Sequence, residues 1–317
     1  MNGSAVQREM QPAPSIWVEG EFDSRLLNEL FPDLFIKQVG PREGRDAVVR
    51  NTRLPHAYGV VDRDLDRRLR LGHSTCGIDN DCASCRSAEC RQRFATNESL
   101  YVTCSTDIEA DIIHLPAVVR RALADPIADA QAEVAWNALV YRVTAVAHQL
   151  AQLRMYPQRL CKSPSSFDAH RGNFQHVSAV RDISQFRSAD SHEINLAGIW
   201  EIVKTSPTCR HDGCKEDPCP FSADLDTTNI RQFDIDAITP IRGHDWVHAL
   251  IDVLERDSLL PNPCTMLRDE LQKLPRIAWK VEQINTRLMA TISATNRGEL
   301  GHIWPLVNDL SSLSPSR

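Results

Sequence analysis

The 317-residue sequence has no apolar run near the roughly 20 residues that a membrane-spanning helix needs. Its start, Met1 to Pro14, is polar and has no apolar centre, so we expect no signal peptide. It contains no G-x-x-x-x-G-K-[ST] pattern, so no P-loop of its own is expected to sense a nucleotide. The net charge of −6 argues against a general basic coat for nucleic acid, but it permits a local basic channel.

The composition is that of a soluble globular protein. Hydrophobic residues make up 42% of the chain and charged residues 25%. At 317 residues the chain is long enough for one large domain or two small ones. Seven of the ten cysteines lie in two clusters. Without a signal peptide we expect a reducing, cytoplasmic location, where clustered cysteines indicate metal binding more than disulfides.

The most informative stretch is a short apolar run that ends in carboxylates. Residues 57–61 have the character of a buried strand, and Asp62 and Asp64 follow directly. Residues i and i+2 of a strand point to the same side, so these two carboxylates could share one hard cation. Without a cation they would repel, and one would take up a proton. The alternative is a strand that runs into a solvated acidic turn.

The first part of the chain alternates between strands and helices. We predict strands at 15–18, 34–39, 57–62 and 99–104, a helix capped by Asp23, and a short polar helix over 42–53. This alternation predicts a parallel sheet with right-handed crossovers. Ligands of such sheets gather at the carboxyl ends of the strands, where Glu19, Asp62 and Asp64 fall.

A second acidic stretch begins a predicted helix after the fourth strand. Ser105 or Thr106 is expected to cap it, and Asp107 or Glu109 is the alternative, because acidic side chains favour a helix N-terminus. Beyond residue 120 the chain is predicted to be mostly helical. Its expected elements are a long helix over 128–155, a helix over 246–254 and a hairpin over 264–293 broken at Pro275. The apolar spacing of the long helix indicates that these residues pack inward: Val134, Leu139, Val143, Val146, Leu150 and Leu153.

The order of these acidic residues resembles the Toprim family, the divalent-metal module of topoisomerases, primases and OLD-family nucleases. Three segments carry a narrower resemblance to Toprim-like proteins encoded beside AAA ATPases in anti-phage defence, such as the PARIS effector: residues 17–23 (WVEGEFD), 59–64 (GVVDRD) and 107–111 (DIEAD). Arg-Gly-His-Asp at 242–245 resembles a Gly-Lys-Asp-type motif of that family, with His244 where lysine is usual. The resemblance covers roughly residues 15–115.

The resemblance implies a Mg²⁺ or Mn²⁺ site in which Asp62 and Asp64 are the main ligands. Glu19 would complete that site or act as a general acid or base. Asp107 and Glu109 could hold a second metal, as in two-metal phosphodiester cleavage. A basic cluster (Arg63, Arg67, Arg68 and Arg70) either binds phosphates or forms a solvated turn.

Two cysteine clusters lie outside the family pattern. Cys76, Cys82, Cys85 and Cys90 supply four thiolates around a C-x2-C step, which predicts structural zinc. Cys209, His211, Cys214 and Cys219 predict a weaker second zinc site, in which His211 is a ligand or a bystander. Buried or incidental cysteines are the alternative for both clusters. Outside the clusters, Cys104, Cys161 and Cys264 are expected to be ordinary buried residues.

The sequence therefore predicts an α/β, Toprim-like Rossmannoid domain at 15–120 with a Cys-rich insertion at 65–98. A flexible N-terminus at 1–14 precedes it, and a mostly helical region at 121–317 with the second cluster at 209–219 follows. The predicted function is a metal-dependent endonuclease of DNA or RNA, including tRNA, in phage defence, regulated by an AAA/ABC-type ATPase partner. No membrane partner is expected, and homo-oligomerisation stays open. The alternative is a non-catalytic, zinc-stabilised scaffold or nucleic-acid-binding subunit; a primase-like accessory role has support only from the fold.

Overall fold

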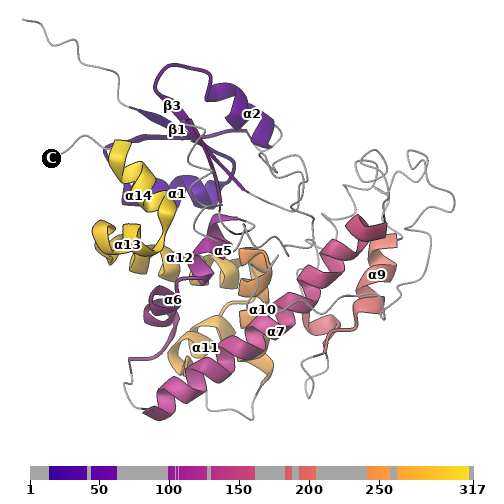
Figure 1. The fold of residues 1–317 in the computed structure, drawn as a ribbon. Helices are drawn as coiled ribbons and strands as arrows, with labels where there is room; N and C mark the ends of the chain where they lie inside the picture. Colours follow the sequence, from indigo (N-terminus) through magenta and orange to yellow (C-terminus); the bar gives the residue numbers. More distant parts are fainter. Residues whose placement is uncertain are drawn as a thin grey trace, which may run out of the picture. The chain divides into compact units, whose positions relative to one another are not determined.

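The computed structural model describes residues 14–40, 44–62, 99–103, 105, 107–126, 130–160, 183–187, 193–204, 241–257 and 263–313. The contacts divide the chain into two compact units, which Figure 1 shows as ribbons and which are described separately. The first unit takes its described residues from 1–62, 92–102 and 295–317. The second takes them from 103–294.

The first unit is built on an all-parallel sheet of four strands in the order β2-β1-β3-β4. The strands are β1 (Ser15–Val18), β2 (Phe35–Gln38), β3 (Ala57–Val61) and β4 (Leu100–Val102). Val18 pairs with Gln38 on one side and with Val60 on the other. The predicted parallel α/β sheet is confirmed, and so is the mostly helical region that follows it.

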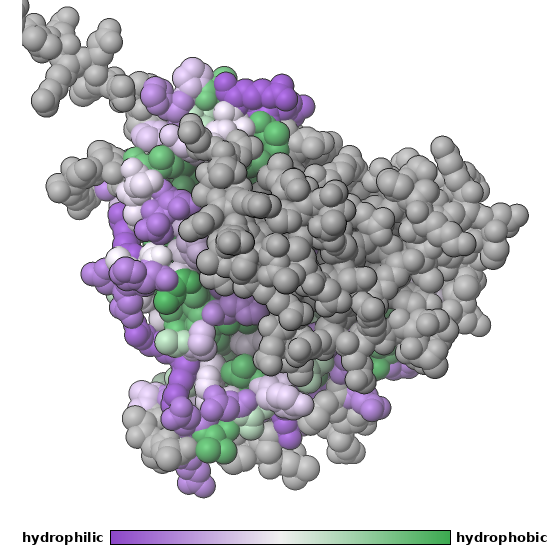
Figure 2. Space-filling model, in the orientation of Figure 1, coloured by the Kyte–Doolittle hydropathy of each residue, from purple (hydrophilic) through white to green (hydrophobic). Residues whose placement is uncertain are grey.

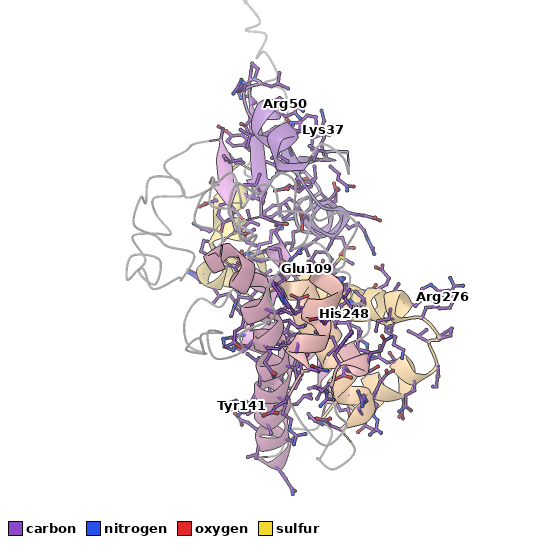
Figure 3. All side chains as sticks on the ribbon, turned by 90° about the vertical axis from the view of Figure 1, so that its right-hand side faces the viewer. Lys37, Arg50, Glu109, Tyr141, His248 and Arg276 are labelled. Carbon is purple, nitrogen blue, oxygen red and sulfur yellow. The ribbon has the colours of Figure 1, made fainter. Side chains whose placement is uncertain are left out.

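Helices α1 (Glu21–Leu30) and α2 (Gly44–Asn51) connect the first three strands. Leu26 and Leu27 of α1 are fully buried, whereas the outer side of α2 is hydrophilic and exposes Arg50 (Figures 2 and 3). Helix α1 begins two residues before the predicted cap. Asp23 is the third residue of the helix, and its carboxylate accepts the N–H of Gly20 at 3.1 Å. It therefore bonds a backbone N–H at the helix start that has no acceptor within the helix.

Gly59 in β3 lets helix α2 lie close to the sheet. A Cβ atom on Gly59 would come within 2.7 Å of both Val48 Cγ1 and Thr52 Cγ2 of the α2 segment. Real Cβ atoms do not make such short contacts, so any larger residue would push the helix away. Glycine therefore sets the distance between this strand and its covering helix.

Two helices from the end of the chain complete the first unit: α13 (Arg297–Ile303) and α14 (Pro305–Leu313). Trp304 between them is 1% exposed, and Leu306 and Val307 are fully buried. The guanidinium of Arg297 lies over the ring of Phe31, which follows α1, at 5.2 Å. The sequence reading did not identify these helices.

The second unit is helical in its described residues. Its elements are α5 (Ile108–Ile113), α6 (Pro116–Leu123), α7 (Ala130–Leu160), η2 (Ile183–Gln185), α9 (Leu196–Lys204), α10 (Gly243–Arg256), α11 (Thr265–Gln272) and α12 (Ile277–Ala294). The predicted long helix, the 246–254 helix and the 264–293 hairpin correspond to α7, α10 and α11–α12. Val134, predicted to pack inward, is 68% exposed, whereas Trp136 is buried. Among the described helices, none has the length and apolar character that a membrane crossing requires.

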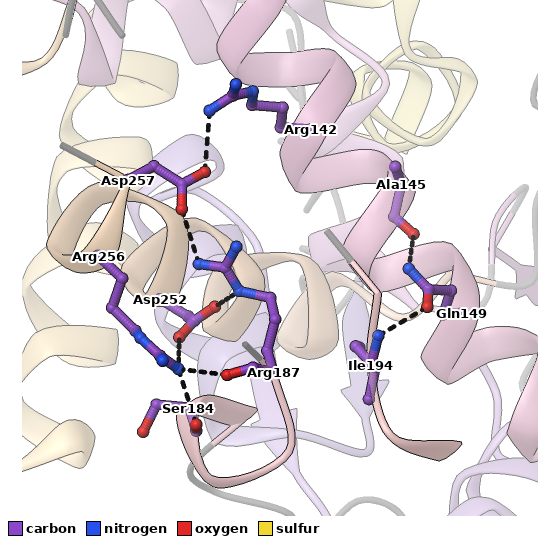
Figure 4. A network of polar contacts seen from close by, with 9 residues as sticks. All are labelled: Arg142, Ala145, Gln149, Ser184, Arg187, Ile194, Asp252, Arg256 and Asp257. Carbon is purple, nitrogen blue, oxygen red and sulfur yellow. Dashed lines mark hydrogen bonds and ion pairs between the residues drawn. The ribbon is translucent and has the colours of Figure 1, made fainter. Parts of the chain in front are cut away.

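A buried ion network joins α10 to the segment around η2 (Figure 4). The guanidinium of Arg187 is fully buried; its Nε donates to Asp252, and its Nη2 donates to Asp257 at 2.9 Å. Arg142 of α7 donates to the other oxygen of Asp257 at 3.0 Å. Burial raises the pKa of Asp252, and the positive charges of Arg187 and Arg256 oppose that rise. The network therefore holds three separate segments together through charge-assisted hydrogen bonds.

Candidate metal site at the carboxyl edge of the sheet

Glu19 and Asp62 are the first residues after two neighbouring strands, β1 and β3. The chain runs from β1 outward to β2 and then crosses back to β3, so the connections diverge between β1 and β3. Such a divergence is the topological switch point of an open parallel sheet, and the crevice at its carboxyl edge is where ligands bind. The strand order therefore brings these two predicted residues to the place where a site is expected.

A hydrogen bond links the two positions across 43 residues of sequence. The backbone N–H of Asp62 donates to Glu19 Oε1 at 3.1 Å. On the other side of the carboxylate, a Cβ on Gly44 would lie 4.0 Å from Glu19 Oε2, so the first residue of α2 is close to it. Gly44 has a positive φ of 51°, a conformation that glycine adopts without strain. Glu19 is thus held between the end of β3 and the start of α2.

The donor chemistry at this edge fits a hard divalent cation. Glu19 and Asp62 offer carboxylate oxygens, the ligands that Mg²⁺ and Mn²⁺ prefer. Within the residues that the structure describes, no three His, Cys, Asp or Glu side chains form a metal-binding group. Asp64 and the basic cluster at Arg63, Arg67, Arg68 and Arg70 lie outside the described residues.

The predicted second pair, Asp107 and Glu109, belongs to the second unit, where Asp107 has a clear structural task. Asp107 is 3% exposed, and its Oδ1 accepts the N–H of Ala110 at 2.7 Å and the N–H of Gly243 at 3.1 Å. It is the N-cap of α5. The cap is therefore Asp107 and not Ser105 or Thr106, because the helix begins at Ile108 and only Asp107 occupies the N-cap position.

The last carboxylate of the same motif is also bonded to backbone. Asp111 is 4% exposed, and its Oδ1 accepts the N–H of Ser105 at 2.6 Å. The motif thus fixes both the loop before α5 and the helix start. Glu109 is half-buried, and its role as a metal ligand stays a prediction.

The Arg-Gly-His-Asp motif meets this acidic motif inside the second unit. A Cβ on Gly243 would lie 2.2 Å from Glu109 Cβ and 2.5 Å from its carbonyl carbon, so only glycine permits the contact. The preceding Arg242 places its Nε 3.7 Å from Asp107 Oδ2. Two segments more than 130 residues apart in sequence are therefore joined by charge, hydrogen bonding and close backbone approach.

His244 and His248 form a pair that the sequence reading did not identify. They are four residues apart on α10, and their Nε2 atoms are 3.0 Å apart, so one ring donates to the other. Figure 3 labels His248 and Glu109 in this part of the second unit. The i, i+4 spacing in the sequence is the signal that could have revealed the pair.

Both cysteine clusters, including His211 and the C-x2-C step at Cys82 and Cys85, lie outside the described residues, so their zinc binding stays a prediction. Cys264 was predicted to be an ordinary buried residue, and it is fully buried. Burial raises the pKa of its thiol to about 12, so it is a neutral, unreactive side chain.

Comparison of the chain with protein-family models, with curated proteins and with solved structures found no match.

Proposed function

We propose that this protein is a divalent-metal-dependent nuclease of Toprim type that cleaves phosphodiester bonds in DNA or RNA. The observation that carries the proposal is the position of Glu19 and Asp62 at the switch point of the parallel sheet, linked by the 3.1 Å hydrogen bond. Two acidic residues at that edge suit a cation-assisted reaction better than they suit packing, because neither lies in the sheet core.

Glu19 and Asp62, with Asp64, would hold Mg²⁺ or Mn²⁺. Such an ion, when bound, neutralises the phosphate and stabilises the developing negative charge of phosphodiester cleavage. The contribution of the chain itself is positional. The N–H of Asp62 fixes the orientation of the Glu19 carboxylate, and that carboxylate is the candidate general acid or base.

The proposed setting is anti-phage defence with an AAA/ABC-type ATPase partner. A nuclease of this kind needs restraint, and the sequence contains no P-loop with which to sense nucleotide by itself. The second candidate function is a non-catalytic, zinc-stabilised scaffold or nucleic-acid-binding subunit. In the DIEAD segment, Asp107 and Asp111 accept hydrogen bonds from backbone N–H groups. This structural role fits the second candidate, but it concerns that segment alone.

Cleavage assays on charge-neutral variants test the proposal. Glu19→Gln and Asp62→Asn keep size and hydrogen-bonding capacity but remove a ligand charge, so we expect loss of Mg²⁺-dependent cleavage with an unchanged melting temperature. The matched control is Glu29→Gln, at an exposed position of α1, which should cleave like the wild type. Full activity in both site variants would show that the chemistry lies away from Glu19 and Asp62, and absence of cleavage by the wild type would leave the scaffold as the better account.

A further inference from the structure

The second unit contains a pocket of about 250 Å³ between α5, α6, α7 and α10. Buried Trp136 and Trp246 belong to its lining, and exposed His114 and Asn137 lie at its rim. No Asp, Glu, Lys or Arg side chain is among the described residues that line it. Although part of the His114 side chain is exposed, the groups packed around its ring desolvate it and lower its pKa, which favours the neutral imidazole. The pocket therefore suits an uncharged ligand with a polar edge.

The volume of the pocket limits the size of that ligand. Pockets for drug-sized molecules begin at about 300 Å³. An engineered apolar cavity of about 150 Å³ in another protein holds benzene. At about 250 Å³ this pocket lies between the two, so it matches a flat group of one or two rings.

The polar groups in the pocket wall can form hydrogen bonds with the edge of such a ring. The Asn137 side chain makes no hydrogen bond within the described part of the chain, and its amide can both donate and accept. Thr144 Oγ1 accepts the indole N–H of Trp246 at 3.3 Å, which leaves its own proton available to donate. Trp136 and Trp246 are 5% and 2% exposed, so their rings form part of the apolar wall against which a flat group would pack.

The pocket shares its wall with the acidic motif. Ala110 lines the pocket and also donates its N–H to Asp107. Ile241, two residues before α10, also lines the pocket. The next residue, Arg242, places its Nε 3.7 Å from Asp107 Oδ2. A ring in the pocket would thus lie beside the segments that carry the two family-like motifs of this unit.

We infer that this pocket binds a single nucleobase, supplied by an unpaired nucleotide of a nucleic-acid strand or by a free nucleoside. Proteins hold an unstacked base by packing it between aromatic or apolar side chains and by forming hydrogen bonds to its edge, and this pocket offers an apolar wall with Asn137 and Thr144. The strand-derived source rests on the proposed nuclease function, whereas the binding of a base does not require it.

Ligand-observed NMR with the four uncharged ribonucleosides and the full chain tests the pocket. We expect at least one nucleoside to bind, and Asn137→Ala to weaken it about tenfold, the effect of about 1.4 kcal/mol. Val140→Phe, which fills the lining, should abolish binding. The matched controls on α7 are Gln131→Ala, which is exposed, and Val134→Phe, which is 68% exposed; both should bind like the wild type. If Val140→Phe lowers the melting temperature, the exposed Asn137 variant still decides the question.

Single-stranded oligonucleotides with one abasic nucleotide, moved stepwise along the strand, separate the two sources. If the wild type binds an oligonucleotide more weakly when the abasic nucleotide is at one particular position, and Val140→Phe does not, the pocket holds a base of the strand. Nucleoside binding without any such position identifies a free nucleoside. Absence of nucleoside binding, with identical strand affinity in Val140→Phe and wild type, would overturn the inference. A protein that binds nucleoside but never cleaves would retain the pocket and lose the proposed function, so the two failures are distinguishable.

Discussion

The acidic residues of segments 17–23 and 107–111 differ in what their carboxylates contact. Glu19 accepts the backbone N–H of Asp62, and it stands half-buried at a sheet edge where ligands bind. Asp107 accepts two N–H groups with one oxygen and is almost fully buried. We therefore assign chemistry first to the sheet edge, and we regard Asp107 chiefly as the residue that joins α5 to α10.

Substitution of Asp107 should reveal this joining role. Asp107→Ala removes an N-cap, at a cost of about 1 kcal/mol. It also leaves the buried N–H of Gly243 without its acceptor, at about 1–3 kcal/mol more. Asp107→Asn keeps the accepting oxygen and should recover most of this loss. Urea denaturation of the full chain measures both, and equal losses in the two variants would contradict the capping account.

At the scale of elements, the strands and the first helices could be predicted because their signals are local. Apolar runs bounded by breakers gave the four strands, and their alternation with helices gave the parallel pairing. The strand ends then placed Glu19 and Asp62 at one edge.

Long-range features could not be predicted in the same way. The cap of α5 was predicted first at Ser105 or Thr106, and the structure confirms the alternative, Asp107. The second donor to Asp107, the N–H of Gly243, comes from a segment more than 130 residues away and could not be predicted from the sequence. Val134 was predicted to be inside because it fits the apolar spacing of the helix, but nothing covers it in the described residues. The return of α13 and α14 to the first unit, and the pocket beside α5, depend on contacts that no local pattern encodes.

Two glycines of the first unit should respond to alanine with opposite signs. Gly59→Ala forces a Cβ to within 2.7 Å of Val48 and Thr52 side-chain atoms, and such overpacking costs about 1–3 kcal/mol. Gly301→Ala in α13 meets nothing nearer than 3.5 Å, and alanine is favoured over glycine in a helix by about 1 kcal/mol. Thermal melts should show a loss for the first and a gain or no change for the second. A neutral Gly59→Ala would mean that α2 can move away from the sheet at little cost.

The ion network of α10 should make stability depend on pH when its buried cation is removed. Arg187→Met removes the guanidinium that pairs with the buried Asp252. Breaking a buried ion pair costs about 3–5 kcal/mol of stability. Burial already raises the pKa of Asp252 above 3.8, and loss of Arg187 raises it further. The folded state then binds a proton that the unfolded state releases, so stability falls as pH rises through this window.

The loss in free energy of unfolding that Arg187→Met causes, relative to wild type, should therefore be larger at neutral than at mildly acidic pH. Arg142→Met is the matched control, because Arg142 is partly exposed and Asp257 retains Arg187 when it is removed. Its deficit should be smaller and nearly independent of pH. A pH-independent deficit in Arg187→Met would show that Asp252 does not take up the proton.

At the scale of the whole molecule, we propose two kinds of metal for two kinds of ligand. The oxygen ligands Glu19, Asp62 and Asp64 are proposed to hold exchangeable Mg²⁺ or Mn²⁺, since these ions keep several waters. The thiolate clusters around Cys82 and Cys214 are predicted to hold structural zinc, whose binding would be coupled to folding. Removal of the first metal should therefore affect chemistry, and removal of the second should affect stability.

Brief chelation with EDTA, followed by metal readdition, tests the central claim most directly. Cleavage of a nucleic-acid substrate and the circular dichroism melt are measured on the same sample before chelation, after it and after each readdition. We predict that EDTA abolishes cleavage while the melt changes little, and that excess Mg²⁺ or Mn²⁺ restores it. Restoration by zinc alone would move the chemistry to the cysteine clusters, and cleavage that survives EDTA untouched would contradict a metal site at Glu19 and Asp62.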